Sequence, residues 1–448
     1  MKILSISLFL LAFAAGFSYG STKSGDWESL FNGKNLNGWK QLNGQAKYEV
    51  VNGEIVGTTV ANTPNSFLTT EKNYSDFILE LELMVESPMN SGIQFRSEST
   101  PEYNNGRVHG YQCEVDPSSR AWSGGIYDEA RRGWLYPCTY NPEGGKAFKM
   151  GEWNKYRIEC IGPDIRTWVN GVPVAHLIDD MTPEGFICLQ VHSIGKDGEP
   201  GHKIRWRNIR IQTKNLKSTP MEDVFVVNLL PNNLSESEKS QGWKLLFDGT
   251  SSKGWKSASG DKFPENGWEV KDGTISVLAK KDGYVKRGGD VVTEEKFKAF
   301  SLQFEFKLTE GANSGVKYCL GNNGPSIGLE YQVLSDSHSD AKMGVVGNRT
   351  IASLYDLIPS EKDGRFMRKD GEWNQGRIVL YPDNRVEHWL NGLKVVEYVR
   401  GSNIYNALVA RSKYAEFENF GMSKETPILL QDHNDHVSFR SIKIKTLD

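Results

Sequence analysis

A repeat that runs through almost the whole chain constrains the fold more than any other feature of the sequence. The segment 27–39 begins with Trp, continues through Leu-Phe-Asn-Gly and closes with Gly-Trp, and 243–255 repeats this pattern with Asp-Gly for Asn-Gly. Further matches follow in the same order: Asn-Ser-Gly at 90–92 and 313–315, Gly-Glu-Trp-Asn at 151–154 and 371–374, and Leu-Gln-x-His at 189–192 and 430–433. Collinear matches of this kind indicate an ancestral duplication. We therefore expect one domain over 26–213 and a second over 242–448.

Apolar and polar residues alternate along several short runs in each copy. Clear examples are Phe-Ile-Leu-Glu-Leu-Glu-Leu at 77–83 and Leu-Gln-Phe-Glu-Phe-Lys-Leu at 302–308. Such alternation is typical of strands with one face on a core, and the Asn-Gly and Asp-Gly pairs at 52–53 and 272–273 mark hairpin turns. Many short strands with little helical periodicity predict an all-β fold, in which each copy is a two-sheet sandwich of jelly-roll type. Between them, 214–241 is expected to be a linker with a short helix near 235–239.

The first twenty residues predict export. Lys2 is followed by an apolar run over 3–15 and then by Ser-Tyr-Gly at 18–20. This pattern is typical of a secretory signal peptide over 1–20, and no cysteine lies near its end to carry a lipid. No later stretch is apolar enough to predict a membrane span. We expect the mature protein in the periplasm or outside the cell.

Charge and cysteine content narrow the classes of ligand. The formal net charge is −3, with acidic and basic residues mixed, which argues against nucleic acid and anionic membranes as partners. The five cysteines show no paired spacing of a zinc or redox site, so no cofactor is predicted. An exported protein could hold one or two disulfides, and buried free thiols are the alternative. A divalent metal at Asp432, His433, Asp435 and His436 has no counterpart in the first copy and is left unassigned.

Polar residues occur at matched outward positions of three strands in each copy. Alternation along these strands places them on the sheet face that points away from the core. The first copy contributes Gln94, Arg96, Gln112, Glu114, Gln190 and His192. The second contributes Lys317, Cys319, Glu330, Gln332, Gln431 and His433.

Two functions and one structural interpretation fit these positions. Amides and carboxylates can bind the neighbouring hydroxyls of a sugar. A carboxylate or histidine beside a cation can also remove a proton next to a carbonyl group. Polar residues on alternate positions are equally what a solvated sheet face contains.

Residues in loops and at strand ends supply further candidates. Tyr127 of the first copy matches Tyr355 of the second copy, where Asp356 follows. Each of these residues could contact a ligand. Trp134, together with Tyr136 and Tyr140, lies in a loop rich in Gly and Pro. Aromatic rings in loops suit stacking on the apolar face of a pyranose.

The ordered motifs resemble those of the 3-keto-disaccharide hydrolase domain family, which was long catalogued as a domain of unknown function. In the first copy the resemblance rests on 27–39, Asn-Ser-Gly-Ile at 90–93, Gly-Tyr-Gln-Cys-Glu at 110–114, 151–154, Asn-Gly at 170–171, 189–192 and Arg-Asn-Ile at 207–209. The second copy repeats it, with Glu-Tyr-Gln at 330–332 closer to the usual Glu-x-Gln order. The two copies cover nearly all of the mature chain.

This resemblance implies a concanavalin-like jelly roll, a periplasmic location and action on glycosides already oxidised to a ketone at C3. It implies cleavage by elimination across C1 and C2 followed by addition of water. The implied base is His192 or Glu114 with Arg96 stabilising the enolate, or Glu330 or His433 with Lys317 in the second copy. The substrate-binding candidates remain those predicted from the matched strand positions and the loops: Gln94, Gln112, Tyr127, Trp134, Gln190, Gln332, Tyr355, Asp356 and Gln431.

The sequence leaves the catalytic copy open, because the first copy reverses the Glu/Gln order and the second has Cys319 at the position of Arg96. A non-catalytic pair of glycan-binding modules is the main alternative, since sandwich folds host binding as readily as turnover. A surface adhesion protein without a small ligand is the third.

Overall fold

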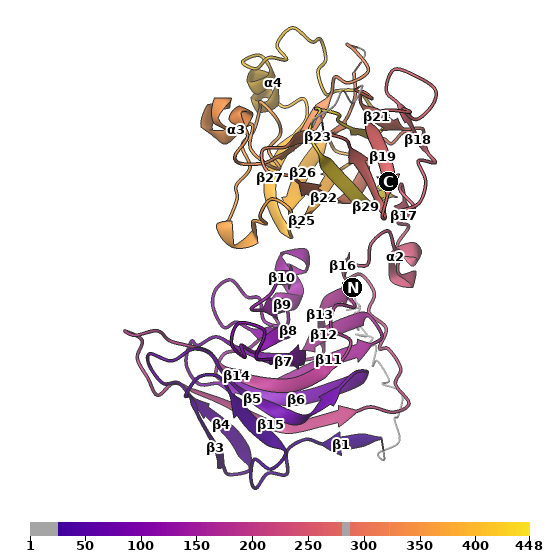
Figure 1. Cartoon of the computed structure of the whole chain (residues 1–448). Coiled ribbons are helices and arrows are strands. Elements are labelled where there is room, and N and C mark those ends of the chain that lie inside the picture. Colours follow the sequence, from indigo (N-terminus) through magenta and orange to yellow (C-terminus); the bar gives the residue numbers. More distant parts are fainter. Residues whose placement is uncertain (1–25, 280–286, 322) are drawn as a thin grey trace, which may run out of the picture.

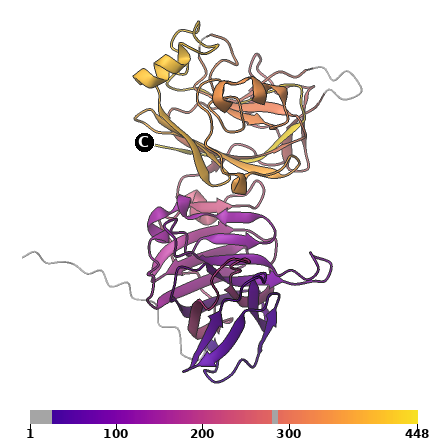
Figure 2. The same cartoon turned by 90° about the vertical axis from the view of Figure 1, so that its left-hand side faces the viewer.

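The computed structural model describes residues 26–279, 287–321 and 323–448, and the expected signal peptide lies outside this part of the chain. Two β-sandwiches lie one above the other, and the segment between them contains the short helix α2 (Glu236–Ser240) beside their junction (Figure 1). The view turned by 90° shows the two as separate layered bodies (Figure 2). Within the described residues, no helix is long and apolar enough to cross a membrane.

The larger sheet of the first sandwich has the strand order β16-β13-β12-β11-β6-β15-β4-β3, and β1 pairs with β15. Its strands are β1 (Trp27–Ser29), β3 (Lys47–Val51), β4 (Glu54–Thr58), β6 (Phe77–Val85), β11 (Asn154–Ile161), β12 (Asp164–Val169), β13 (Val172–Ile178), β15 (Lys203–Gln212) and β16 (Val226–Asn228).

The facing sheet has the order β10-β9-β8-β7-β14-β5-β2. It consists of β2 (Trp39–Leu42), β5 (Ser66–Tyr74), β7 (Ser91–Glu98), β8 (His109–Val115), β9 (Ile126–Glu129), β10 (Gly133–Tyr136) and β14 (Gly185–Val191). The 3₁₀ helix η1 (Cys138–Tyr140) and the single-turn helix α1 (Pro142–Gly145) follow β10.

The second sandwich repeats this architecture with two smaller sheets, ordered β19-β20-β29-β22-β25-β26-β27, with β17 on β29, and β18-β21-β28-β23-β24. The first contains β17 (Lys244–Leu245), β19 (Trp268–Lys271), β20 (Thr274–Val277), β22 (Phe300–Leu308), β25 (Trp373–Leu380), β26 (Arg385–Leu390), β27 (Leu393–Val399) and β29 (Val437–Thr446). The second contains β18 (Trp255–Ser257), β21 (Val291–Thr293), β23 (Asn313–Tyr318), β24 (Leu329–Leu334) and β28 (Leu429–Leu430). Its helices are α3 (Ser339–Met343), η2 (Val345–Gly347), η3 (Gly364–Phe366) and α4 (Asn403–Val409).

The period-two patterns explain why these segments are strands. Every second residue of β6 from Phe77 to Val85, and of β22 from Phe300 to Leu308, is at most 3% exposed and contributes to one of two separate cores. The Asn-Gly pair at 52–53 and the Asp-Gly pair at 272–273 have positive φ and connect β3 to β4 and β19 to β20. The predicted pair of all-β sandwiches of jelly-roll type is confirmed.

The segment 214–241 does more than connect the two domains. Its strand β16 pairs in parallel with β13 and extends the first sandwich. Helix α2 begins with a capping box between Ser235 and Glu238, and Glu238 also forms a buried ion pair with Lys443 of the second sandwich at 2.5 Å. The segment therefore belongs to the packing of both domains.

The five cysteines are free and buried in this structure. Burial raises the pKa of the Cys113 and Cys188 thiols well above the usual range. Of the two alternatives that the sequence left open, the structure has the buried free thiols.

Candidate functional site

A row of amides and one carboxylate crosses the outward face of β8, β7 and β14 in the first domain. The Gln112 side chain accepts hydrogen bonds from Gln94 (3.2 Å) and Gln190 (3.0 Å) and donates one to Glu114 (2.9 Å). Gly92 makes this row possible, because a Cβ atom there would lie 2.3 Å from Cδ of Gln112. The structure thus brings together four residues that the sequence predicted on this face.

Glu114 is the titratable group at the end of the row. Its Oε1 accepts a 2.5 Å hydrogen bond from Asn90 and lies 3.9 Å from the guanidinium of Arg120. The side chain is almost fully buried, and this burial raises the pKa of Glu114 to about 7, although the hydrogen bonds and Arg120 act in the opposite direction. A carboxyl group with such a pKa can both accept and donate a proton near neutral pH.

Arg120 is the cation of this site, and sequence reasoning missed it. Its Nε donates a 2.7 Å hydrogen bond to Asp116, and its guanidinium lies 4.5 Å from the Trp122 ring and 5.1 Å from the Trp134 ring. The turn between β8 and β9 carries both Asp116 and Arg120, close after Glu114. The available signal was a pair of opposite charges, Asp116 and Arg120, that follows directly after the strand carrying Glu114.

Tyr127 and Trp134 form an aromatic wall beside this cation. Tyr127 lies opposite Gln112 in the strand register, and its ring is 5.2 Å from that of Trp134, which is 4.7 Å from Trp122. Trp134 is only 9% exposed, so little of its ring is available for stacking on a ligand.

His192 follows the end of β14, two residues after Gln190, and is half-buried. Its Nδ1 lies 2.7 Å from the carbonyl oxygen of Ser193. A carbonyl oxygen only accepts, so Nδ1 carries a proton and, in the neutral ring, Nε2 is free to accept one. No hydrogen bond joins His192 to Glu114 among the described residues.

The expected position of Arg96 on this face is wrong. Arg96 has a φ of 44° at a β-bulge in β7, where the pairing with β8 shifts between Phe95 and Glu98. The bulge breaks the alternation of side chains. The buried guanidinium instead donates to the carbonyls of Ser75 (2.7 Å) and Gly162 (2.8 Å) and pairs with Asp76 at 3.0 Å.

The second domain has a guanidinium in a comparable setting. Cys319, which matches Arg96, also has a positive φ and lies 3.0 Å from Nη1 of Arg400. Arg400 donates to the carbonyls of Gly421 and Ser423 and to the Asn384 side chain between β25 and β26. These contacts indicate a structural role for Arg96 in the first domain and for Arg400 in the second.

The matching face of the second domain exchanges the carboxylate and the amide. Lys317 lies 3.5 Å from Glu330, and Gln332 donates to Asn313 at 2.9 Å, as Asn90 bonds Glu114 in the first domain. Burial raises the pKa of Glu330, and the nearby Lys317 and Lys413 act against this shift.

A segment with no counterpart in the first domain lies over this second face. Residues 179–184 connect β13 to β14, whereas 400–428 connect β27 to β28 and carry α4. The Lys413 backbone donates to Asp356 (3.1 Å), its ammonium lies 4.2 Å from the Tyr355 ring, and the neighbouring Tyr414 is only 5% exposed.

Internal contacts also engage Tyr355 and Asp356 of this face. Tyr355 donates to Asp340 (2.8 Å), and Arg349 donates to Asp356 (2.8 Å). The buried Oε1 of Gln431 has no hydrogen-bond partner among the described residues. His433 is half-exposed and lies 3.9 Å from Asp435. Nowhere in 26–279, 287–321 and 323–448 do three or more His, Cys, Asp or Glu side chains gather as metal ligands.

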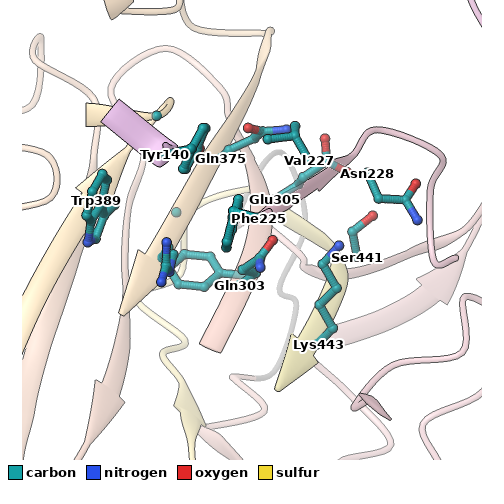
Figure 3. Close-up of a pocket in the computed structure, with 14 residues that line it drawn as sticks. Tyr140, Phe225, Val227, Asn228, Gln303, Glu305, Gln375, Trp389, Ser441 and Lys443 are labelled. Carbon is teal, nitrogen blue, oxygen red and sulfur yellow. The ribbon is translucent and has the colours of Figure 1, made fainter. Parts of the chain in front are cut away.

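The interface between the domains contains a separate small cavity of about 30 Å³ (Figure 3). Tyr140 stacks there on Phe225 at 4.7 Å and on Trp389 at 6.0 Å, and the buried Tyr136 donates to the carbonyl of Phe225. These two tyrosines, which the sequence offered as sugar platforms, therefore belong to the domain interface.

Comparison with known proteins places the chain in a family. The model of the 3-keto-alpha-glucoside-1,2-lyase-like domain matches residues 26–212 and again residues 242–445. The chain belongs to this family. It is also similar to a protein from Bacteroides thetaiotaomicron named 3-keto-disaccharide hydrolase, with 34% identity over 235 residues that cover 47% of this chain and 80% of the relative. Membership and this relative support a carbohydrate-active protein, as the residues predicted.

Solved structures cover about half of the chain. The crystal structure of a candidate glycosyl hydrolase from Parabacteroides distasonis is 30% identical, with a TM-score of 0.43, and covers 49% of this chain and 100% of its own. The carbohydrate-binding module CBM66 from Bacillus subtilis is 16% identical, with a TM-score of 0.27, and covers 40% of this chain and 97% of its own.

Proposed function

We propose that the first domain cleaves glycosides that carry a ketone at C3. The observation that carries this proposal is the buried Glu114, whose pKa is raised to about 7, beside Arg120 and the amide row. Family membership supports the substrate class. A base and a cation side by side are the groups that enolisation next to a ketone requires.

In the proposed first step, ionised Glu114 takes the proton from C2, and the electron pair of the C2–H bond forms the enolate of the C3 ketone. Arg120 or the Asn90 amide stabilises the enolate oxygen. The enolate electrons then re-form the C3 ketone and the C1–C2 double bond as the C1–O bond breaks, and the aglycone oxygen takes the proton that Glu114 removed from C2. Water added back across C1 and C2 gives the free 3-keto sugar, so the net reaction is hydrolysis.

Contacts within the second domain support the assignment to the first. Glu330 is paired with Lys317, and Lys413 and Tyr414 lie over the same face. A substrate could reach this face only by displacing the segment 400–428. That displacement would expose the buried Tyr414 ring and break the Lys413 contacts, which is unfavourable. We infer that the second domain is not an independent catalytic unit.

Glycan binding without turnover is the second candidate. The observation that favours it is the row of Gln94, Gln112 and Gln190, because amides both donate to and accept from hydroxyl groups. We further propose that the protein is periplasmic or secreted, because of the apolar run and small residues within 1–20.

Release of 4-nitrophenol from its 3-keto-glucoside by the full chain tests the proposal, with the unoxidised glucoside as the control. Release from the keto substrate alone is the expected result. Release from neither substrate, combined with saturable sugar binding in a calorimetric titration, would replace catalysis with the glycan-binding function.

A further inference from the structure

The second domain touches the first domain beside the proposed site. Its 3₁₀ helix η3 lies against β10, and Phe366 at the end of η3 is 4% exposed within the buried cluster of the first domain. The Phe366 ring is 5.8 Å from that of Trp122, with an interplanar angle of 80°. Trp122 in turn contacts Trp134, so one aromatic series joins the second domain to the wall beside Arg120.

Arg368, two residues after Phe366, reaches the Tyr127 end of this wall. A Cβ atom at Gly133 would lie 3.8 Å from Nη1 of Arg368 and 3.7 Å from Cε2 of Tyr127. The guanidinium and the tyrosine ring therefore flank the same glycine.

Arg368 differs from the other arginines around this site in its pairing. Each of the others has a carboxylate within 2.7 Å: Arg107 with Glu129, Arg120 with Asp116, Arg131 with Asp128, and Arg132 with Asp128 and Asp179. Within the described part of the chain, Arg368 has neither an ion pair nor a side-chain hydrogen bond. Burial, and repulsion from Arg132, lower the pKa of Arg368, while Glu372 and Asp128 act in the opposite direction.

We propose that Arg368 is a specificity-determining residue of the first-domain site, supplied by the second domain, and that it binds a carboxylate on the glycoside. A partly buried cation with a like charge nearby is stabilised more by an anion than by a neutral hydroxyl. The planar guanidinium suits a carboxylate, which it can hold with two parallel hydrogen bonds. This inference rests on the proposed function, since it names the class of glycoside that the site accepts.

A pair of substrates of equal size tests the inference. The 3-keto-glucosides of 4-hydroxybenzoate and of 4-hydroxybenzamide differ in the charge of the aglycone. We expect the full chain to cleave the carboxylate substrate with a kcat/KM about tenfold higher, mainly through a lower KM, because a charge-assisted hydrogen bond distinguishes the two. Arg368→Gln should bring the ratio between the two substrates to about one, and Arg368→Lys should restore part of it.

Lys369→Gln is the matched control, because it removes the neighbouring exposed cation and should keep the preference. Equal kcat/KM values for the two substrates in the unmodified chain, or a preference that survives in Arg368→Gln, would overturn the inference. If the chain cleaves neither substrate, the proposed function fails on its own. In that case, calorimetry measures the affinity of the chain for the unoxidised 4-carboxyphenyl glucoside. An affinity about tenfold lower in Arg368→Gln would support carboxylate binding by Arg368, and an unchanged affinity would overturn it.

Discussion

Asn90 donates a 2.5 Å hydrogen bond to the buried Oε1 of Glu114 and links the loop before β7 to the end of β8. The bond stabilises the carboxylate, whereas burial favours the protonated acid, and the balance leaves the pKa of Glu114 at about 7. The second domain pairs the matching residues, which are both neutral, and there Gln332 donates to Asn313. The matching contact therefore contains an ionisable side chain, Glu114, in the first domain and only amide side chains in the second.

Replacing this group tests the role of the first domain. Glu114→Gln keeps the size of the side chain but removes the base, so we expect kcat to fall at least about a hundredfold, as is typical for loss of a general base. Chromogenic release from the 3-keto-glucoside measures the effect. Glu330→Gln is the matched control and should change kcat less than threefold. A larger loss in Glu330→Gln than in Glu114→Gln would transfer catalysis to the second domain.

The pH dependence of the rate follows from the raised pKa of Glu114. The base must be ionised, so kcat/KM should be low at pH 5, rise with pH and reach half of its maximum near pH 7. An ordinary glutamate would reach half-maximum near pH 4.5. Rates measured between pH 5 and pH 9 give this profile. A rate that falls with rising pH would instead make Glu114 the acid in the slow step.

Arg96 should affect stability and leave catalysis almost unchanged. Arg96→Ala removes three hydrogen bonds and leaves the carbonyls of Ser75 and Gly162 without donors, which we expect to lower the free energy of unfolding by about 3 kcal/mol. Urea unfolding and kcat/KM of the folded variant give the two readouts. Arg207→Ala, which removes a partly exposed pair with Glu82, should cost less than about 1 kcal/mol. If Arg96→Ala lost activity while its free energy of unfolding stayed unchanged, Arg96 would instead be part of the catalytic site.

Thiol chemistry checks the packing of both cores. All five cysteines are buried and free, and the thiolate is the reactive form, so Ellman's reagent should label almost none of them in the native protein. In guanidinium chloride it should label all five. Fewer than five labelled thiols in the unfolded, unreduced chain would show that the protein contains a disulfide.

Several features of the protein follow from local sequence patterns. The repeat and the period-two alternation predicted two sandwiches, because a strand with one buried face needs apolar residues at every second position whatever lies far away in the chain. The same alternation placed Gln94, Gln112, Glu114 and Gln190 on one face correctly, because β7, β8 and β14 are neighbours and regular at those positions.

The rest was decided by contacts that no local pattern specifies. The bulge in β7 turned Arg96 away from the polar face, and period two holds only while a strand is regular. Packing of 400–428 covered Glu330, and docking of η3 brought Arg368 to Tyr127. The burial of Glu114, and with it a pKa of about 7, depends on residues from separate loops, so the sequence alone named the carboxylate and only the tertiary structure set its proton affinity.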